Sequence, residues 1–483
     1  MYITDRLVGR CKRVEVRNTE CAERSQPMFP RLTKQPYVET TGRRIAMTEA
    51  KVQTPAARSC PVSGTPGLDE ISLLSPEALE CPYHAYARVR AEDPVHHLPD
   101  QNLWIVSRYD DVDYVLSNPE KFTSKEALSS GNAYRDFPAA LKVLKKSKAL
   151  PRQRTLILAD PPVHAFHRKV VQRALAPAKT LRAFGPTIKE RVNGFIDCFV
   201  EEGQFECVSQ FSIPLPMALV SMIFDVTEKQ VYEMKGWSDN FFSALTGHVA
   251  EETVMKAALD TLVFEDFVLE RMEKARTEGS DCFIGKLLNA PEDERPLTDA
   301  EVINICSQVL VGGNESTINF ISNLVYAIAT TKGLEERLRN EPDLLQNFLE
   351  ENLRHEAPLQ SMYRIALESV EVGGVTIPAG AKLMLNFGSA NRDEAHYENG
   401  EALDINRDNR ETLHMAFGRG IHACAGQTIA RREGMIAIRV LLSRVKNLRI
   451  AEGTTPERNP LFGVRGFKTL HVAFDAVPQT EDA

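Results

Sequence analysis

The stretch FGRGIHACAG, from Phe417 to Gly426, places one cysteine between a glycine-rich turn and the beginning of a helix with an apolar pattern. A cysteine binds metal as the thiolate, and a helix N-terminus favours that anion through its unpaired N–H groups and the positive end of the helix dipole. Gly418, Gly420 and Gly426 allow the main chain to approach the sulfur and a flat cofactor closely. Cys424 is therefore a candidate thiolate ligand of an iron centre, although a lone cysteine is more often a buried structural residue.

The composition indicates a large globular protein. The chain has 483 residues, of which 43% are hydrophobic, and it can bury a large core. Its formal charge of -8 and the lack of a basic stripe with interleaved aromatics give no indication of a nucleic-acid partner. The longest apolar stretch, Ser212 to Phe224, is shorter than a membrane span. Nine scattered cysteines without a CxxC pair are typical of reduced thiols, so we expect a cytoplasmic protein with no transmembrane anchor.

The N-terminal region differs from the rest of the chain. Its first 46 residues carry ten Lys or Arg against five Asp or Glu and show little apolar periodicity. We expect residues 1–66 to be a disordered N-terminal extension and residues 67–483 to form a single domain. Alternatively, translation begins at Met47, in which case residues 1–46 are absent from the native protein.

Periodicity predicts a mainly α fold with a small β region. Two strand-like runs cover Val95 to Leu98 and Leu103 to Val106, and helical patterns dominate from Asp160 to about Thr331. The segment Val370 to Asn386 is rich in β-branched residues around turn signals, which predicts hairpins. No internal repeat is evident, which excludes a solenoid.

One long helix can be delimited from its ends. Thr298 and Glu301 form a capping box, and apolar positions continue from there to a stop near Gly333. Near its middle lies GGNEST, Gly312 to Thr317, where Gly312 and Gly313 each cost about 1 kcal/mol relative to alanine. Glycines there allow a large flat ligand to approach the helix, and the neighbouring hydroxyls can bond back to carbonyls one turn earlier. A tolerated glycine pair in an ordinary kink is the alternative.

Taken together, these segments resemble the cytochrome P-450 family of heme-thiolate monooxygenases in its soluble bacterial form. FGRGIHACAG is similar to the family's heme-ligand loop and LVGGNESTINF to its oxygen-binding helix. Glu351-Asn352-Leu353-Arg354 is similar to the Glu-x-x-Arg helix, and DPPVHAFHR, Asp160 to Arg168, to the helix that reaches a heme propionate. The resemblance implies a triangular helical prism around a buried heme b.

The same resemblance implies the heme contacts. Cys424 takes the position of the iron ligand, within a loop that also supplies Phe417, Gly418 and Gly426, and Gly312 and Gly313 lie on the other face of the heme. Phe417 would shield the sulfur from water. The propionates need cationic or hydrogen-bonding partners, and the resemblance assigns this role to four residues. These are His164, Arg168, Arg364 and His422. Taken alone, His164 would be read as a solvated surface residue.

Two further groups follow from the resemblance. Glu351 and Arg354 correspond to a buried pair joined by an arginine from a later loop, for which Arg407 is the best match, and these three are expected to support the Cys424 loop. On the distal side, Glu315 fits the acid and Ser316 the alcohol of a proton relay, with Thr317 following. Threonine is commoner in the family at the position of Ser316, so the effect of serine there is open. Serine lacks the methyl group that restrains its rotamer.

The expected substrate is a small, mostly hydrophobic molecule, terpenoid-like or aromatic, that reacts with dioxygen. The pocket walls are expected at the helix before Gly312, at Leu359 to Met362, at Leu461 to Phe467, and in the segments Ala127 to Phe137 and Phe241 to Leu245, although such residues can simply fill a core.

Electrons are expected to come from a separate ferredoxin or flavodoxin. Lys169, Arg173, Arg431 and Arg432 either dock this donor or are merely solvated helix charges. The alternative functions are a peroxide-driven or non-oxygenating heme-thiolate enzyme and a heme-based binding or sensor protein. The pair of Glu315 and Ser316 argues against the first, because such enzymes need no oxygen-activation relay.

Overall fold

The computed structural model describes residues 75–126, 137–149, 154–175, 178–245, 250–408, 413–461 and 463–478. All of them belong to one compact unit, Val52–Ala483. The expected extension 1–66 and the boundary at residue 67 lie outside the described residues, so the domain assignment stays a prediction.

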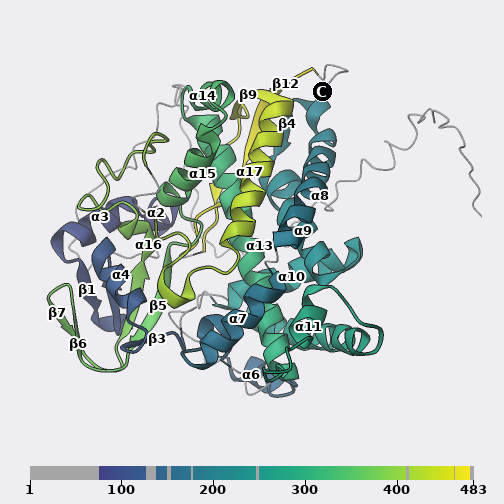
Figure 1. Cartoon of the computed structure of the whole chain (residues 1–483). Coiled ribbons are helices and arrows are strands. Elements are labelled where there is room, and N and C mark those ends of the chain that lie inside the picture. Colours follow the sequence, from purple (N-terminus) through teal and green to yellow (C-terminus); the bar gives the residue numbers. More distant parts are fainter. Residues whose placement is uncertain are drawn as a thin grey trace, which may run out of the picture. The chain divides into compact units, whose positions relative to one another are not determined.

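Helices dominate the described part of the chain (Figure 1). They are α2 (Pro76–Glu80), α3 (Tyr83–Glu92), α4 (Tyr109–Ser117), α6 (Pro138–Leu144), α7 (Val163–Leu175), α8 (Ala178–Asp197), α9 (Pro214–Phe224), α10 (Glu228–Leu245), α11 (Glu251–Glu278), α12 (Phe283–Leu288), α13 (Asp299–Thr330), α14 (Leu334–Asn340), α15 (Leu344–His355), α16 (Phe387–Ala390) and α17 (Gln427–Arg444). Short 3-10 turns lie at Pro99–Gln101, Leu156–Leu158, Val200–Glu202 and Gly420–His422, and a π-helical turn at Val208–Ser212.

The strands form four small sheets. They are β1 (Val95–Leu98), β2 (Leu103–Val106), β3 (Phe122–Thr123), β4 (Gln204–Glu206), β5 (Ser361–Ala366), β6 (Val370–Val372), β7 (Val375–Ile377), β8 (Lys382–Asn386), β9 (Val445–Ile450), β10 (Glu457–Arg458), β11 (Phe467–Thr469) and β12 (His471–Ala476). The largest sheet has the order β1-β2-β8-β5-β3, and only its β2–β8 pair is parallel. The others have the orders β4-β12-β9, β6-β7 and β10-β11. This sheet content confirms the mainly α class with a small β region.

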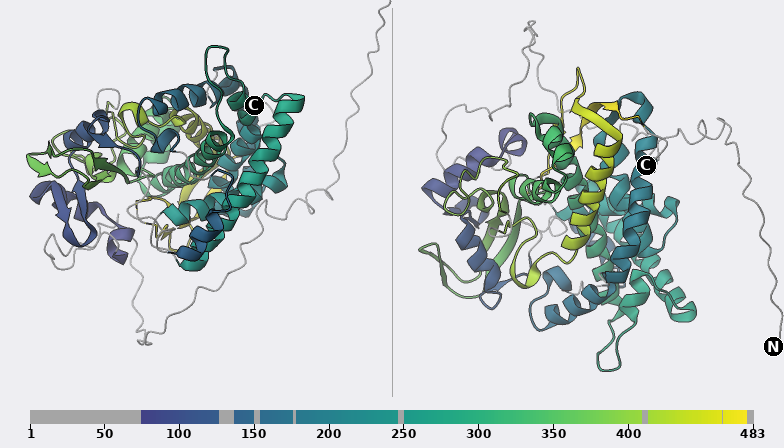
Figure 2. Two further views of the ribbon diagram at one scale, coloured as in Figure 1. Left: turned by 90° about the horizontal axis from the view of Figure 1, so that it is seen from below. Right: turned by 45° about the horizontal axis from the view of Figure 1, so that its top comes forward.

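Helix α13 is the element around which the others pack. Thr298 caps it through the expected capping box, because its side chain accepts from the N–H of Glu301 while Glu301 accepts from the N–H of Thr298. Its 32 residues correspond to about 48 Å. It contacts α9, α10, α11, α15 and α17, and both views of Figure 2 show the purple N-terminal elements on the side away from the teal helices α8 to α11. The predicted long central helix is therefore confirmed.

Two expectations need correction. Only one hairpin forms between Val370 and Asn386, from β6 and β7, because β8 pairs with β5 and β2 inside the larger sheet. The expectation of reduced thiols throughout is wrong for Cys81, which is disulfide-bonded. Cys207, Cys282, Cys306 and Cys424 carry free thiols.

The apolar stretch at Ser212 to Phe224 forms the core helix α9, as expected. Among the helices of the described residues, none is by itself both long and apolar enough to cross a membrane. The bent pair Val208–Phe224 and Lys229–Ala244 passes this test only when its two halves are counted together.

The α13–α17 contact depends on one glycine. A Cβ at Gly434 of α17 would lie 2.6 Å from the Cε1 atom of Phe320 and 3.4 Å from the Cδ2 atom of Leu349. Phe320 is only 1% exposed, so its ring has little room to move. A β-carbon at position 434 would therefore push α17 and α13 apart.

We expect Gly434→Ala to lower the free energy of unfolding by about 1–3 kcal/mol, since overpacking forces side chains and backbone to shift. Gly194→Ala in α8 is the matched control, because nothing lies within 4 Å of a Cβ there. That control should gain up to about 1 kcal/mol, as alanine favours a helix over glycine. Denaturant unfolding of both variants measures the difference, and equal effects would contradict the close-packing account.

Candidate active site

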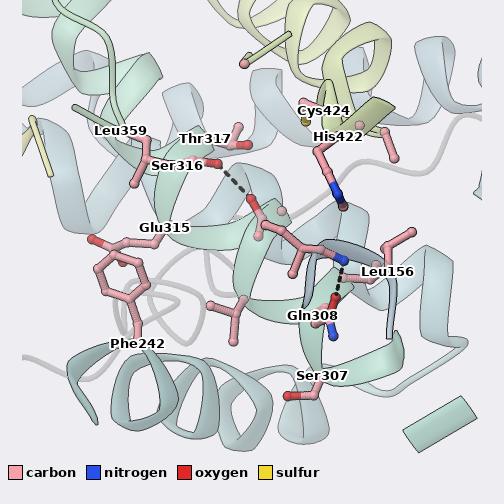
Figure 3. A pocket seen from close by; sticks show the side chains of 18 of the residues that line it. Leu156, Phe242, Ser307, Gln308, Glu315, Ser316, Thr317, Leu359, His422 and Cys424 are labelled. Atoms are coloured by element: carbon pink, nitrogen blue, oxygen red, sulfur yellow. Dashed lines mark hydrogen bonds between the residues drawn. The ribbon is translucent and has the colours of Figure 1, made fainter. Parts of the chain in front are cut away.

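A cavity of about 610 Å³ lies between α13 and the segment that precedes α17 (Figure 3). Its walls are mostly apolar, and they combine segments that lie far apart in the sequence. They include Leu156–Leu158, residues of α9 from Pro216 to Phe224, Phe241 and Phe242 of α10, Phe264 of α11, Ile303 to Thr317 of α13, Leu359, Met362 and Val464. Cys424 and His422 lie across this space from Ser316, and the Glu315 side chain extends from α13 toward Phe242 (Figure 3).

Cys424 lies three residues before α17 and is exposed to the cavity. Its N–H donates to the carbonyl of Phe417 at 2.8 Å, which closes the loop. Burial raises the pKa of the Cys424 thiol, while the main-chain N–H groups of Gly426 and Gln427 and the guanidinium of Arg168 lower it. The helix N-terminus therefore favours the thiolate as expected, but without a bound cation this effect does not outweigh burial.

Each glycine of the loop meets a different geometric requirement. Gly418 and Gly420 have left-handed φ angles of +63° and +66°, which glycine adopts without strain. A Cβ at Gly420 would also lie 2.4 Å from the carbonyl oxygen of Leu116, so this residue allows the loop to pack on α4 rather than on the sulfur. At Gly426 the nearest atom to a Cβ would be the Cys424 sulfur, at 3.9 Å, which agrees with the expected close approach.

Four cationic or imidazole side chains meet at one edge of the cavity. They are His164 and Arg168 of α7, Arg364 of β5 and His422 of the Cys424 loop. The rings of His164 and His422 have centroids 4.1 Å apart. Burial, Arg168 and other nearby cations lower the pKa of His164 to about 4, and burial, Arg364 and His164 lower that of His422 to about 3. The two predicted propionate contacts thus form a single cluster.

This cluster has too little negative charge of its own. Asp160 is the acid that acts on it, but the Asp160 carboxylate already accepts from the N–H of Ser124 at 2.9 Å and from the hydroxyl of Thr123 at 2.5 Å. The Nε2 atom of His422 is buried without a hydrogen-bond partner, and burial lowers the pKa of Arg364 to about 10. An anionic group bound at this edge would accept a hydrogen bond from His422 and would stabilise the charge of Arg364.

On the opposite wall, α13 presents a surface without side chains. No atom outside the helix lies within 4 Å of a Cβ placed at Gly312 or Gly313. The hydroxyl of Ser316 donates to the carbonyl of Gly312 at 2.7 Å, which is the expected bond back to the preceding turn (Figure 3). Thr317 also lines the cavity and is 3% exposed. The structure therefore brings the glycine pair and both hydroxyls to the same level.

Glu315 is held by two amide side chains that the sequence gave no reason to select. Its Oε1 atom accepts from the Nδ2 atoms of Asn319 at 3.5 Å and of Asn459 at 3.2 Å. Burial raises the pKa of Glu315, Asp239 raises it further, and Lys235 lowers it. Asn459 could not have been found from spacing, because it lies 144 residues away along the chain.

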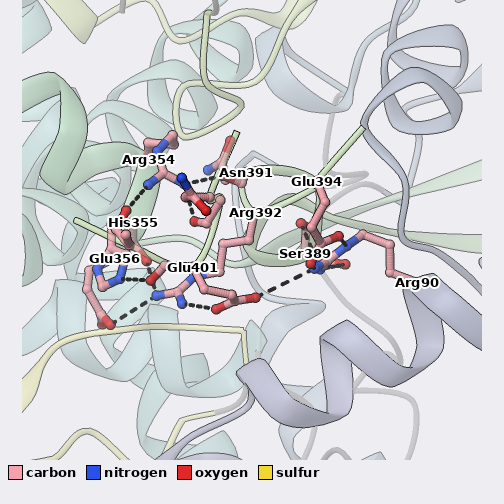
Figure 4. Close-up of polar contacts among 12 residues, drawn as sticks. Arg90, Arg354, His355, Glu356, Ser389, Asn391, Arg392, Glu394 and Glu401 are labelled. Carbon is pink, nitrogen blue, oxygen red and sulfur yellow. Dashed lines mark hydrogen bonds and ion pairs between the residues drawn. The ribbon is translucent and has the colours of Figure 1, made fainter. Parts of the chain in front are cut away.

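Glu351 and Arg354 form a completely buried ion pair at 2.7 Å, both with 0% exposure. The Nε atom of Arg407 lies 3.3 Å from the Glu351 carboxylate, so the expected triad does come together. Arg354 donates to the carbonyls of Asn391 and Gly400, both at 2.7 Å (Figure 4). These bonds hold the chain after α16.

That chain in turn reaches the Cys424 loop. The side-chain oxygen of Asn391 accepts from the N–H of Met415 at 2.6 Å, and the N–H of Gly418 donates to the carbonyl of Met415 at 2.8 Å. Other buried arginines fix the same region, since Arg392 bonds Glu401 at 2.5 Å and Arg90 bonds Glu394 at 2.6 Å (Figure 4). The triad thus contacts the Cys424 loop only indirectly.

The four cations considered for electron-donor docking are mostly paired within the protein. Lys169 and Arg173 both bond Glu294, the latter at 3.1 Å. Arg431 makes a two-point contact with Glu350, at 2.7 and 2.9 Å, and covers the Phe417 ring at 4.4 Å. These three cations therefore have ion-pair partners within the protein, and their role in docking an electron donor stays a prediction.

Most of the expected pocket walls line the cavity. This holds for the helix before Gly312, for Leu359 to Met362, for Gly463 and Val464, and for Phe241 and Phe242. Residues 127–136 lie outside the described part of the chain, and Phe137 packs against Ala140 and its neighbours instead. The sequence did not indicate Leu156–Leu158 or the α9 wall.

A heme fits this arrangement. One side offers a single sulfur, the facing helix has no side chains at Gly312 and Gly313, and the edge carries buried cations that need an anion. Within the described ranges, no group of three or more His, Cys, Asp or Glu could hold a metal ion. Fold and cavity together define a mainly α heme protein.

The comparisons with known proteins specify the family. Residues 217–465 match the family model described as cytochrome P-450. The putative cytochrome P-450 YjiB of Bacillus subtilis is 32% identical over 80% of this chain and 93% of its own. Nocardicin C N-oxygenase of Nocardia uniformis subsp. tsuyamanensis is 33% identical over 80% of this chain and 92% of its own.

A solved structure agrees with these relatives. The crystal structure of CYP109E1 from Bacillus megaterium in complex with testosterone has a TM-score of 0.70 and 30% identity, and the match covers 81% of this chain and 99% of that one. The chain belongs to the cytochrome P-450 family and is a monooxygenase of the bacterial type whose cofactor is heme b. This confirms the fold, enzyme class and cofactor expected from the motifs.

Glu433 of α17 is a buried carboxyl group in the cavity wall whose role the motifs did not suggest. It is 1% exposed, its Oε1 atom has no hydrogen-bond partner, and burial raises its pKa from 4.5 to about 8. Between these pH values the folded protein binds a proton that the unfolded chain has released. The free energy of unfolding therefore falls as the pH rises from about 4.5 to about 8.

We expect Glu433→Gln, which has a similar shape and no charge, to remove this dependence. The stability gain of the variant should grow as the pH is raised from 5 to about 8 and then level off. Urea unfolding of both proteins at several pH values measures the difference in their free energies of unfolding. A gain that is independent of pH would show that Glu433 is ionised in the folded protein.

Proposed function

We propose that this monooxygenase inserts one oxygen atom from dioxygen into a small, mostly hydrophobic substrate, terpenoid-like or aromatic, in the cytoplasm. A separate ferredoxin or flavodoxin supplies its electrons. The observation that carries the proposal is the apolar cavity with Cys424 on one side and Glu315 and Ser316 on the other. The heme, when bound, supplies the iron at which dioxygen is reduced.

In this proposal Cys424 is the iron ligand. Its thiolate would be stabilised by the N–H groups of Gly426 and Gln427 and by Arg168, which already lower its pKa. With heme bound, a thiolate ligand at this position would donate electron density to the iron. The Phe417 ring, covered by Arg431 at 4.4 Å, excludes water from this side.

The cationic cluster would hold the propionates of a bound heme. Arg168 and Arg364 supply permanent charge, and His164 and His422 supply N–H donors in their neutral form. Because Asp160 is already engaged, the cluster can accept two carboxylates without excess negative charge. Gly312 and Gly313 leave room for the distal face of the macrocycle.

Glu315 and Ser316 are the proposed proton relay. Burial raises the pKa of Glu315, which makes it a proton donor closer to neutral pH than an exposed carboxyl group. Asn319 and Asn459 fix its Oε1 atom and leave Oε2 for the proton. The Ser316 hydroxyl is oriented by its bond to the Gly312 carbonyl, and Thr317 lies next to it.

The substrate class rests on the cavity walls. Their aromatic and aliphatic side chains, from Leu156 to Val464, favour an apolar molecule of compact shape. CYP109E1 was crystallised with testosterone, a steroid of this chemical kind. Polar groups in the wall, such as Asn304 and Ser307, would orient a hydroxyl or keto group of the substrate.

Turnover with a surrogate ferredoxin and reductase tests the proposal. Compounds are first screened for a spin-state shift of the ferric heme and then incubated with isotopically labelled dioxygen. We expect the best ligands to be terpenoids, steroids or aromatic compounds and their products to contain one labelled oxygen atom. Products that gain oxygen only from water or peroxide would contradict the proposed reaction.

We expect Glu315→Gln to slow product formation while heme content stays unchanged, since glutamine can still accept hydrogen bonds from Asn319 and Asn459 but has no acidic proton to transfer. In the native enzyme, the ratio of product to electrons consumed should fall as the pH rises through the elevated pKa of Glu315. In Glu315→Gln this ratio should not fall over the same pH range. An unchanged turnover rate would remove Glu315 from the relay.

We expect Ser316→Thr to release less peroxide per electron pair, because the added methyl group restrains the rotamer of the hydroxyl. The bond to the Gly312 carbonyl can still form. Peroxide and product are measured together at matched rates of electron transfer. Equal or greater peroxide release would show that serine does not loosen the relay.

A further inference from the structure

One wall of the cavity has a strained main chain. The 3-10 turn Leu156–Leu158 lies between the loop after α6 and helix α7. Leu156 has φ +43°, a left-handed value that a branched, bulky residue rarely adopts. Its side chain nevertheless lines the cavity (Figure 3). Such a conformation persists only where surrounding contacts over-determine it.

Gln308 of α13 supplies the first of these contacts. Its Oε1 atom accepts from the N–H of Ile157 at 3.1 Å. Its Nε2 atom donates to the carbonyl of Thr155 at 3.1 Å and to the hydroxyl of Thr155 at 2.8 Å. The amide thus pairs with both main-chain groups that flank Leu156, as a neighbouring strand would, and Figure 3 marks the bond of Gln308 next to Leu156.

His167 of α7 supplies the second contact. Its Nδ1 atom accepts from the N–H of Leu156 at 3.3 Å, so the ring proton is on Nε2, which lies 2.9 Å from the Oε1 atom of Glu301. Although burial raises the pKa of Glu301, Arg295, the N–H of Thr298 and His167 lower it to about 2. A carboxylate at the start of α13 therefore fixes the tautomer that holds Leu156.

Gln308 and His167, which bond the turn, belong to the two helices that also carry other residues of the site. Gln308 precedes Gly312 by one turn of α13, and His167 is adjacent to Arg168 in α7. Two of the three N–H groups of the turn, at Leu156 and Ile157, are bonded to side chains, and the third, at Leu158, donates to the Thr155 carbonyl at 2.9 Å. The position of this wall is thus set by two side chains as well as by the main-chain bonds of the 3-10 turn.

We propose that Gln308 and His167 are positioning residues that fix the turn Leu156–Leu158, and that the Leu156 side chain held in this way limits the size of the ligand that reaches the iron. The wall selects compact apolar molecules by excluding bulky ones, a steric form of specificity. This inference rests on the proposed function only in placing the iron next to Cys424.

Hydrogen exchange tests the positioning role without any turnover. Gln308→Met keeps the shape of the side chain and removes both hydrogen-bonding atoms. We expect the amide of Ile157 to exchange at least about tenfold faster in this variant, because its opening no longer breaks a bond to the side chain. Asn304→Met is the matched control one turn earlier in α13, since among the described residues the side chain of Asn304 bonds only the carbonyl of Ala300 in its own helix. It should leave that amide protected.

Binding of two nitrogen ligands to the ferric holoenzyme tests the size limit. Imidazole is the small probe and 1-tritylimidazole the bulky one, and both are followed by the shift of the Soret band. In Gln308→Met we expect the ratio of the bulky to the small dissociation constant to fall at least about fivefold, because the wall can yield. Leu156→Gly should lower the same ratio while the amide of Ile157 stays protected, because glycine adopts the left-handed φ without strain.

Gln308→Met and Leu156→Gly together test the positioning role and the size limit. If Gln308→Met folds poorly, Leu156→Gly still tests whether this side chain limits ligand size. An unchanged ratio in Leu156→Gly, or unchanged exchange at Ile157 in Gln308→Met, would overturn the inference. Failure of the proposed function would be seen separately, as loss of the spectral signature of thiolate ligation in the unmodified enzyme.

Discussion

The structure depends on the burial of a cysteine sulfur that has to carry a negative charge. Burial alone raises the pKa of Cys424, and the N–H groups of Gly426 and Gln427 with Arg168 only partly offset it. A metal cation bound to the sulfur would supply the balance. The loop geometry follows from this need, since Gly418 and Gly420 turn the chain so that the Cys424 N–H bonds the Phe417 carbonyl. The buried triad of Glu351, Arg354 and Arg407 fixes the segment on which the loop rests.

The other walls of the cavity provide what an anionic cofactor needs, namely positive charge and space. Four buried or half-buried cationic or imidazole groups meet without enough negative charge, and His422 keeps an unpaired Nε2 atom. Across the cavity, α13 combines a surface without side chains at Gly312 and Gly313 with a protonatable Glu315. Long helices that pack around α13 hold these groups in fixed positions. One helix therefore provides space for the cofactor, the proposed proton relay and, through Gln308, a wall of the substrate space.

Features with a local sequence cause were predictable. The capping box placed the start of α13 at Thr298, and the motif around Cys424 identified the loop, its glycines and the heme. The Glu351–Arg354 pair and the cluster at His164 also came together as the resemblance implied. Long-range contacts were not predictable, because no spacing links Asn459 to Glu315 or Gln308 to Thr155. The same limit explains why β8 was expected in a hairpin, although its partners are β5 and β2, and why the disulfide at Cys81 was missed.

The central claim is that Cys424 binds the heme iron as a thiolate, and the carbon monoxide complex of the reduced protein tests it most directly. The account predicts the red-shifted Soret band that only thiolate ligation gives. It also predicts that Cys424→Ser still takes up heme, because the cationic cluster and the glycine surface of α13 are intact, but loses this band. A red-shifted band that persists in Cys424→Ser, or its absence in the unmodified enzyme that has taken up heme, would contradict the assignment.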